Sequence, residues 1–187
     1  MAHRIVSDEV FLATALDLFR TYGFEGVSLK QLADATGLEK ASLYYRYPGG
    51  KDAIAMAAAG EAVRWLQANV FDPLAGGGPP RKRVSLVAEK LREFYAGGLK
   101  ACVMDVLSIR GGSEELQLGL KTAMQALTSA FAHVAKESGY GAAAARSKAE
   151  EAVVRLEGSL ILARVLGDTA CFERVLKGLP DLLTAPS

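Results

Sequence analysis

The sequence predicts an all-α protein with a small N-terminal group of helices and a larger C-terminal helical bundle. Apolar residues recur at the spacing of amphipathic helices along most of the 187 residues. No sustained alternation of apolar and polar residues bounded by turns indicates a strand. Capping residues, glycines and prolines also divide the chain into segments of helical length.

The N-terminal third predicts four helices. Ser7, followed by two acidic residues, is a good N-cap for the first helix, which ends near Gly23. Ser28 and Gln31 have the spacing of a capping box that opens the second helix. The third helix must stop at Pro48, because proline cannot continue it. The predicted ranges are about 7–23, 28–35, 39–47 and 51–71.

The remaining helices follow a predicted linker, DPLAGGGPPRKR at 72–83, whose glycines and prolines disfavour regular structure. Apolar spacing predicts a helix after residue 84, a short one over 102–110, and a long one from its cap at Ser113 to Gly139. Two more are expected over 147–166 and 169–178, the last closed by Gly178 with Pro180 beyond it.

The composition favours a globular, intracellular protein. Half of the residues are hydrophobic and 23% are charged, with a formal net charge of +1, which argues against a disordered chain. No run of eighteen apolar residues is present, and MAHRIVSDEV contains no apolar signal-peptide core. Cys102 and Cys171 are too few for a disulfide scaffold. We expect a cytoplasmic protein without a membrane partner.

The second and third helices have the spacing of a helix-turn-helix. Ala33 must be small where the next helix crosses it, and Gly37 can adopt the left-handed conformation that a tight turn requires. Leu38 and Leu43 supply the apolar contacts that hold the third helix in place. Thr36 stands where an apolar residue is preferred, which is a mild departure.

The third helix separates its residues into two sides. With Lys40 at zero on a helical wheel, Tyr44 falls at about 40°, Ala41 at about 100° and Tyr45 at about 140°, with the packing residue Leu43 on the opposite side. A DNA major groove admits such a helix, since Lys donates to guanine and Ala or a Tyr ring contacts a thymine methyl. The short side chains of Ala41 and Ser42 permit close approach.

The charge does not by itself indicate a nucleic-acid partner. Residues 1–52 contain six Lys or Arg against seven Asp or Glu, a net charge of −1, which counts against a non-specific binder. Residues 28–51 are locally basic, with four Lys or Arg against two acidic residues. The alternative is that the tyrosine-rich third helix merely packs against a neighbouring helix.

The stretch from 7 to 66 resembles the N-terminal domain of the tetracycline-repressor (TetR) family. The resemblance rests on FRTYGFEGVSLKQLA, on LYYRY at the end of the third helix, and on the Lys that opens the fourth. Arg46 and Tyr47 stand where the family usually has His and Phe. PGGK has one residue more than the commonest form and resembles a subgroup related to lincomycin-resistance regulators.

This resemblance implies a helix-turn-helix DNA-binding domain over 1–50 and a ligand-binding and dimerisation domain over 51–187. Lys40, Ala41 and Tyr44 would read bases, with Ser42 beside them, and Ser28, Tyr45, Arg46 and Lys51 would hold phosphates. The implied function is a homodimeric repressor, released from a palindromic operator by a small effector, with no cofactor.

The stretch EEAVVRLEGSLILARVLGD at 150–168, most of which lies in the predicted helix 147–166, is apolar on nearly all sides. Contacts within its own bundle are therefore not enough to bury it. Together with the last helix it predicts a four-helix homodimer interface, as the family also implies. The alternative is a central helix of a monomer. The residues assigned to the interface are Leu156, Leu160, Ala163, Phe172 and Leu176.

A largely apolar effector is expected inside the C-terminal bundle. The candidate lining residues, which could also be ordinary core, are Trp65, Phe94, Tyr95, Met104, Met124 and Phe131.

Two other functions stay open: an architectural DNA-binding protein without an effector, and a small α-helical enzyme. The isolated His3 and His133 predict neither a metal site nor a catalytic set. PGGKD lacks the pattern of a phosphate-binding loop. Whether Cys102 or Cys171 has a redox role is left open.

Overall fold

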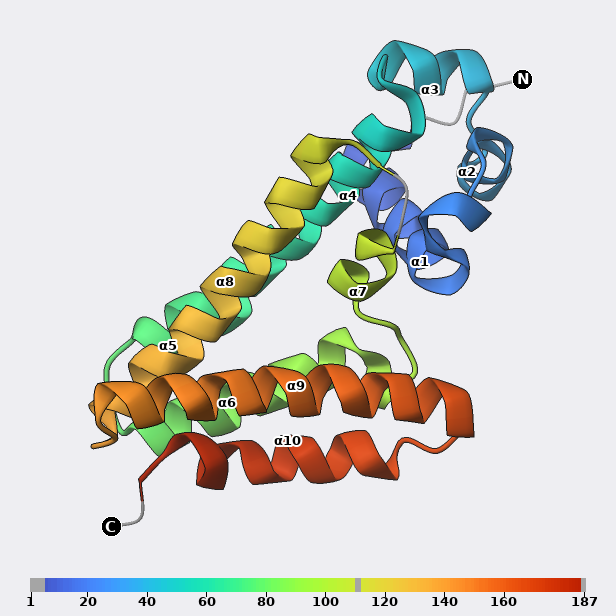
Figure 1. The fold of residues 1–187 in the computed structure, drawn as a ribbon. Helices are drawn as coiled ribbons and strands as arrows, with labels where there is room; N and C mark the ends of the chain where they lie inside the picture. The colour runs from blue at the N-terminus through green and yellow to red at the C-terminus, as the bar shows by residue number, and fades with distance from the viewer. Residues whose placement is uncertain (1–5, 110–111, 186–187) are drawn as a thin grey trace. The chain divides into compact units, whose positions relative to one another are not determined.

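The computed structural model describes residues 6–109 and 112–185, which form helices joined by short connections and contain no strand (Figure 1). His3 and Arg110 lie outside these ranges. The chain divides into two compact units, Met1–Val63 with Val103–Lys121, and Arg64–Cys102 with Thr122–Ser187. The expected DNA-binding domain over 1–50 and ligand-binding and dimerisation domain over 51–187 were defined by function, and this division stays a prediction.

The first unit is built around the first helix, which packs against α2 and α7. Its elements are α1 (Asp8–Gly26), α2 (Leu29–Thr36), α3 (Lys40–Arg46), most of α4 (Gly50–Leu66), α7 (Val103–Ser108) and the start of α8 (Glu114–Glu137). α1 begins where predicted, since the Ser7 hydroxyl accepts a hydrogen bond from the Val10 amide at 3.3 Å. Its predicted end at Gly23 is a break with φ 70°, after which the helix resumes for one short turn.

The start of α8 is fixed within the same unit. The Ser113 hydroxyl accepts a hydrogen bond from the Leu116 amide at 3.3 Å, so the predicted cap is confirmed. The amide of Ser113 itself donates to Oδ1 of Asp52, in the first turn of α4, at 2.8 Å.

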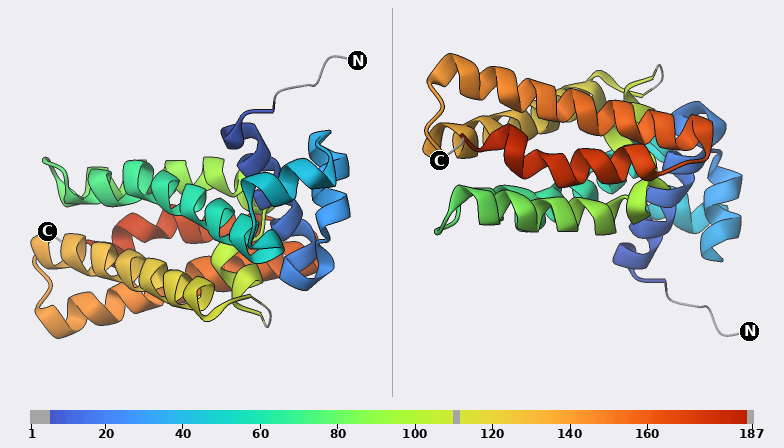
Figure 2. Two further views of the ribbon diagram at one scale, coloured as in Figure 1. Left: turned by 90° about the horizontal axis from the view of Figure 1, so that it is seen from above. Right: turned by 90° about the horizontal axis from the view of Figure 1, so that it is seen from below.

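The second unit packs its last helix along two others, α6 and α9, and both views of Figure 2 keep α9 and α10 side by side. Its elements are the π-helical segment η1 (Gln67–Phe71), α5 (Asp72–Ala75), α6 (Pro80–Phe94), the 3-10 turn η2 (Ala96–Gly98), α9 (Ala142–Leu166), α10 (Ala170–Leu183) and the remaining parts of α4 and α8. Nε of Arg92 in α6 donates to both carboxylate oxygens of Glu173 in α10, at 3.0 and 3.1 Å.

Three predicted boundaries in this unit were wrong, and one of them is the start of α9, which lies at Ala142 rather than near 147. The expected linker over 72–83 is irregular only from 76 to 79, because α5 covers its start and Pro80, with its fixed φ, occupies the first position of α6. α10 does not stop at Gly178 but continues through Pro180 to Leu183. The buried face of α10 extends through Leu179 to Leu183, and this packing outweighs the hydrogen bond that Pro180 cannot donate. Among the described residues, no helix is both long and apolar enough to span a membrane.

Arg83, the last residue of the predicted linker over 72–83, is buried in the first turns of α6. Its Nη1 donates to the carbonyls of Leu74 at 2.6 Å and Gly76 at 2.7 Å, and its Nη2 donates to the carboxylate of Glu137 at the end of α8. The hydrogen bond from Arg83 lowers the pKa of Glu137. Arg83 therefore ties the end of α5, the following turn and α8 together.

We predict that Arg83→Met destabilises the second unit by about 2–3 kcal/mol, because two carbonyls and a carboxylate lose a charged donor. The free energy of unfolding from urea denaturation measures this. Lys82→Met is the matched control, since Lys82 is the exposed neighbour and should change the free energy by less than about 0.5 kcal/mol. Equal effects of the two substitutions would contradict the bridging role of Arg83.

Candidate nucleic-acid interface

The connection between α2 and α3 has the geometry of a helix-turn-helix. Gly37 follows α2 in the left-handed conformation with φ 71°, and the amide of Leu38 donates to the carbonyl of Ala33 at 3.1 Å. An added Cβ at Gly37 would meet no atom within 4 Å, so glycine is required there by backbone conformation rather than by space. The hydroxyl of Thr36 donates to the carbonyl of Leu32 at 2.7 Å, which satisfies this polar residue. The predicted tight turn is confirmed.

The predicted capping box at the start of α2 is also confirmed. Ser28 Oγ accepts from the amide of Gln31 at 3.2 Å, and Gln31 Oε1 accepts from the amide of Ser28 at 2.8 Å. The Ser28 side chain is exposed, and a hydroxyl that accepts one hydrogen bond can still donate its own proton.

The exposed side of α3 carries the residues that the helical wheel places together. Lys40, Ala41, Tyr44 and Tyr45 are exposed, with Tyr44 at 55% and Tyr45 at 89%, and Ser42 is half-buried. Leu43, on the opposite side, is buried. Two large aromatic side chains are thus left in solvent on a helix of seven residues.

Tyr47, just after α3, behaves differently from these two tyrosines. Its ring stacks on Phe11 of α1 with centroids 5.3 Å apart and planes inclined by 21°. Burial raises the pKa of Tyr47, and the nearby Asp8 carboxylate raises it further, so the phenol stays neutral. Packing against a neighbouring helix therefore accounts for Tyr47 but not for Tyr44 and Tyr45.

Arg46 and Lys51 stand on either side of the 47–50 turn, and each of these cations contacts an acidic residue of α1. Arg46 Nη1 lies 3.2 Å from Oδ1 of Asp8 and donates to the carbonyl of Val6 at 3.0 Å. Lys51 Nζ lies 3.5 Å from Oε2 of Glu25 and 4.3 Å from the centroid of the Phe24 ring. α4 begins at Gly50, so Lys51 lies in its first turn, close to the predicted start.

Asp8 and Glu25 were not predicted from the sequence as neighbours of these cations. The paired residues are 38 and 26 positions apart in the chain, and no local pattern connects them. The net charge of −1 over residues 1–52 was the available signal that acidic residues lie near the basic ones.

The five residues predicted for the dimer interface are all buried within a single chain, and their contact with a partner stays a prediction. Leu156, Leu160 and Ala163 face the interior along α9, and Phe172 and Leu176 do so along α10, where the two helices pack together. The apolar surface that α9 leaves in solvent lies on its other side. It consists of Val154, Ile161, Leu162, Val165 and Leu166.

The residues predicted to line an effector pocket divide between the two units. Met104 is buried in the first unit. In the second, Trp65 stacks on Phe94 with centroids 4.1 Å apart, Phe94 meets Tyr95 edge-on at 5.1 Å, and the Tyr95 hydroxyl contacts Sγ of Cys102 at 3.7 Å. Met124 is half-buried and Phe131 fully buried in the same unit. Their role in binding stays a prediction.

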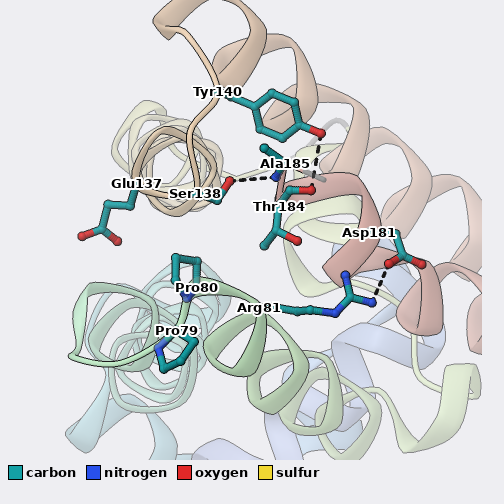
Figure 3. Close-up of a pocket in the computed structure, with 9 residues that line it drawn as sticks. All are labelled: Pro79, Pro80, Arg81, Glu137, Ser138, Tyr140, Asp181, Thr184 and Ala185. Carbon is teal, nitrogen blue, oxygen red and sulfur yellow. Dashed lines mark hydrogen bonds and ion pairs between the residues drawn. The ribbon is translucent and has the colours of Figure 1, made fainter. Parts of the chain in front are cut away.

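A pocket of about 740 Å³ lies elsewhere in the second unit (Figure 3). It is lined by Pro79, Pro80, Arg81, Glu137, Ser138, Tyr140, Asp181, Thr184 and Ala185, none of which was a predicted effector contact. Arg81 Nη2 pairs with Oδ1 of Asp181 at 2.6 Å, and the Tyr140 hydroxyl donates to the Thr184 carbonyl at 3.5 Å. Arg81, Asp181 and the Tyr140 hydroxyl therefore already have hydrogen-bonding partners within the pocket wall. No group of three or more His, Cys, Asp or Glu that could hold a metal occurs in the described ranges.

Comparisons with known proteins agree with this geometry. Residues 11–58 match the model of bacterial regulatory proteins of the tetR family. The chain is 23% identical over 186 residues to the HTH-type transcriptional regulator LmrA of Bacillus subtilis strain 168, with 95% of this chain and 96% of that one covered.

Solved structures share the whole fold. A TetR transcriptional regulator from Legionella pneumophila superimposes with a TM-score of 0.84 at 20% identity, covering 96% of this chain and 98% of that one. A cysteine mutant of CifR, a TetR family transcriptional regulator whose structure includes a complex with 26bp double-strand operator DNA, superimposes with a TM-score of 0.74 at 22% identity, covering 97% and 98%. With the helix-turn-helix geometry of α2 and α3, the family match identifies residues 11–58 as a DNA-binding domain of the TetR family of transcriptional regulators, and the solved structures show that the whole chain shares their fold.

Proposed function

We propose that this regulator is a cytoplasmic, homodimeric repressor that binds a palindromic operator and is released by a small, largely apolar effector. The observation that carries the proposal is the exposed side of α3, where Lys40, Tyr44 and Tyr45 stand in solvent above the buried Leu43. A helix with this surface fits a major groove, in which Lys40 donates to guanine and Ala41 and the ring of Tyr44 contact thymine methyl groups. The small Ser42 lets the backbone approach.

The residues around this helix are suited to hold phosphates. Ser28 retains a donor at the start of α2, and Tyr45 carries its hydroxyl at the rim of the exposed side. Arg46 and Lys51 supply positive charge on either side of the 47–50 turn, and Lys51 adds to the positive end of the α4 dipole. Such contacts fix the register of the protein on the duplex without reading its sequence.

The exposed stripe of α9 supports a homodimer. Val154, Ile161 and Val165 lie at intervals of seven and four residues along one side of the helix, with Gly158 between them. An added Cβ at Gly158 would meet no atom within 4 Å, so the backbone is open to close approach by a partner. Two copies related by a two-fold axis would present two α3 helices to half-sites about one helical turn, ~34–36 Å, apart.

The aromatic residues of the second unit support an apolar effector. Trp65, Phe94 and Tyr95 form a contiguous cluster, and polarizable Met124 and bulky Phe131 belong to the same unit. α4 contributes residues to both units, so a ligand that shifts the end of α4 can act on its start. The effector would favour a state in which the two α3 helices no longer match the operator.

The first test separates base reading from phosphate binding. Lys40→Ala should weaken binding to the selected operator by about 1–3 kcal/mol and relax the sequence preference at one position of each half-site. Lys51→Ala should weaken operator and scrambled duplex alike and reduce the salt slope by about one per contact. Titrations of both duplexes at several salt concentrations measure these effects. If Lys40→Ala leaves the sequence preference unchanged, α3 does not read bases through Lys40.

The second test concerns assembly. Val165→Arg places a charge near the C-terminal end of the exposed α9 stripe, where Val165 is 72% exposed, so the fold should survive while the dimer dissociates and operator binding is lost. Leu86→Arg is the matched control, since Leu86 is an exposed apolar residue on α6. Sedimentation velocity at micromolar concentration gives the mass of each variant. A wild-type protein that is a stable monomer would contradict the proposal.

The third test uses Trp65, the single tryptophan of the chain, as a reporter. An apolar ligand that enters the aromatic cluster should change the fluorescence of Trp65 and weaken operator binding, with a coupling free energy of about 1–3 kcal/mol. A library of small aromatic compounds, screened by emission and then by DNA titration, provides the measurement. Ligands that change the emission but never the DNA affinity would favour an architectural role.

A further inference from the structure

Both ends of α1 carry an acidic residue that contacts a cation of the 46–51 segment. Asp8 lies in the first turn of α1 beside Arg46, and Glu25 lies in its last turn beside Lys51. These are the cations that the proposed function assigns to phosphate binding. In the free protein, the place that a phosphate oxygen would take near each cation is therefore shared with a carboxylate.

The surroundings of Lys51 hold its ammonium group near the carboxylate. Nζ lies over the Phe24 ring, and the Lys51 side chain is only 24% exposed. A cation held against an aromatic face has fewer positions open to it than a lysine in free solvent. A phosphate that approaches the ammonium group meets the Glu25 carboxylate, which lies 3.5 Å from it.

Arg46 is held in a comparable way. Its Nη1 is shared between the Val6 carbonyl and Asp8, and its side chain is 28% exposed. The carboxylates, by contrast, lie mostly in solvent, and exposed ion pairs of this kind are weak. Asp8 and Glu25 can thus be displaced by DNA, but at a cost for each cation.

We propose that Asp8 and Glu25 set the DNA affinity of this regulator by competing with phosphate for Arg46 and Lys51. The inference rests on the proposed function, in which these two cations hold the operator backbone. Affinity for random DNA comes almost entirely from such phosphate contacts. Acidic competitors therefore limit the time spent on random sequence, and the net charge of −1 over residues 1–52 is consistent with this.

Neutral variants of the full-length protein test the competition. Asp8→Asn and Glu25→Gln should each tighten binding roughly two- to fivefold per protomer, hence about 4- to 25-fold for a dimer on two half-sites. The gain should appear on a duplex selected from a random library and on a scrambled duplex of equal length. The salt slope should stay that of the wild type, because the same phosphates are neutralised.

Glu9→Gln is the matched control. Glu9 lies next to Asp8 in the first turn of α1. Glu9→Gln therefore changes the net charge, and the charge at the N-terminal end of the α1 dipole, in the same way as Asp8→Asn. Thermal unfolding of all three variants excludes a general change in stability. If Glu9→Gln tightens binding as much as Asp8→Asn and Glu25→Gln, the effect is one of overall charge and the inference is overturned.

A double-mutant cycle then identifies the pair. In a Lys51→Met background, Glu25→Gln should no longer tighten binding, because the cation for which glutamate competes is gone. A full gain in that background would overturn the inference for Glu25 while leaving the proposed function intact. If Lys51→Met itself does not weaken binding to either duplex, Lys51 holds no phosphate, and the proposed role of this residue fails together with the inference.

Discussion

The stacking of Tyr47 on Phe11 is the interaction on which the exposed side of α3 depends. α3 has seven residues, too few to be stable as an isolated helix. Leu43 anchors its inner side, and the ring of Tyr47 holds its end against α1. With this inner side fixed, the helical period leaves Tyr44 and Tyr45 in solvent. Tyr47 thus packs within the chain, whereas Tyr44 and Tyr45 stay accessible to a partner.

α9 has apolar residues on two opposite sides, and only one of these sides is buried within its own chain. One side of the helix, with Leu156, Leu160 and Ala163, completes the interior of its own chain against α10. The other side leaves Val154 and Val165 largely exposed. A contiguous apolar stripe in solvent is unusual for a monomer and is typical of an interface. The fold of one chain therefore buries only part of the apolar surface of α9.

The helix-turn-helix could be predicted from sequence because its signals are local. The Ser28 cap, the Gly37 turn and the Pro48 stop all act within a few residues of where they stand. The environment of Arg83 was not predictable in this way, since its carboxylate partner Glu137 is 54 residues away. The same holds for the carboxylates beside Arg46 and Lys51.

The faces of α9 illustrate a second limit of sequence analysis. Helical periodicity shows that two apolar stripes exist, but it does not show which stripe the chain covers itself. Leu156 and Leu160 were therefore assigned to a partner, although the single chain already buries them. Likewise, Pro180 is a breaker by its local chemistry, and only the tertiary packing of α10 explains why the helix continues through it.

The interleaved order of the two units constrains how the chain can fold. The first unit consists of residues 1–63 and 103–121. The second unit consists of residues 64–102 and 122–187. Contacts that join such distant segments require closure of long loops, which slows folding. During synthesis, the helix-turn-helix would leave the ribosome well before α7, which packs on α1, has been made. A nascent or truncated chain ending at α4 would therefore expose part of its core, so the first unit cannot be excised as one continuous segment.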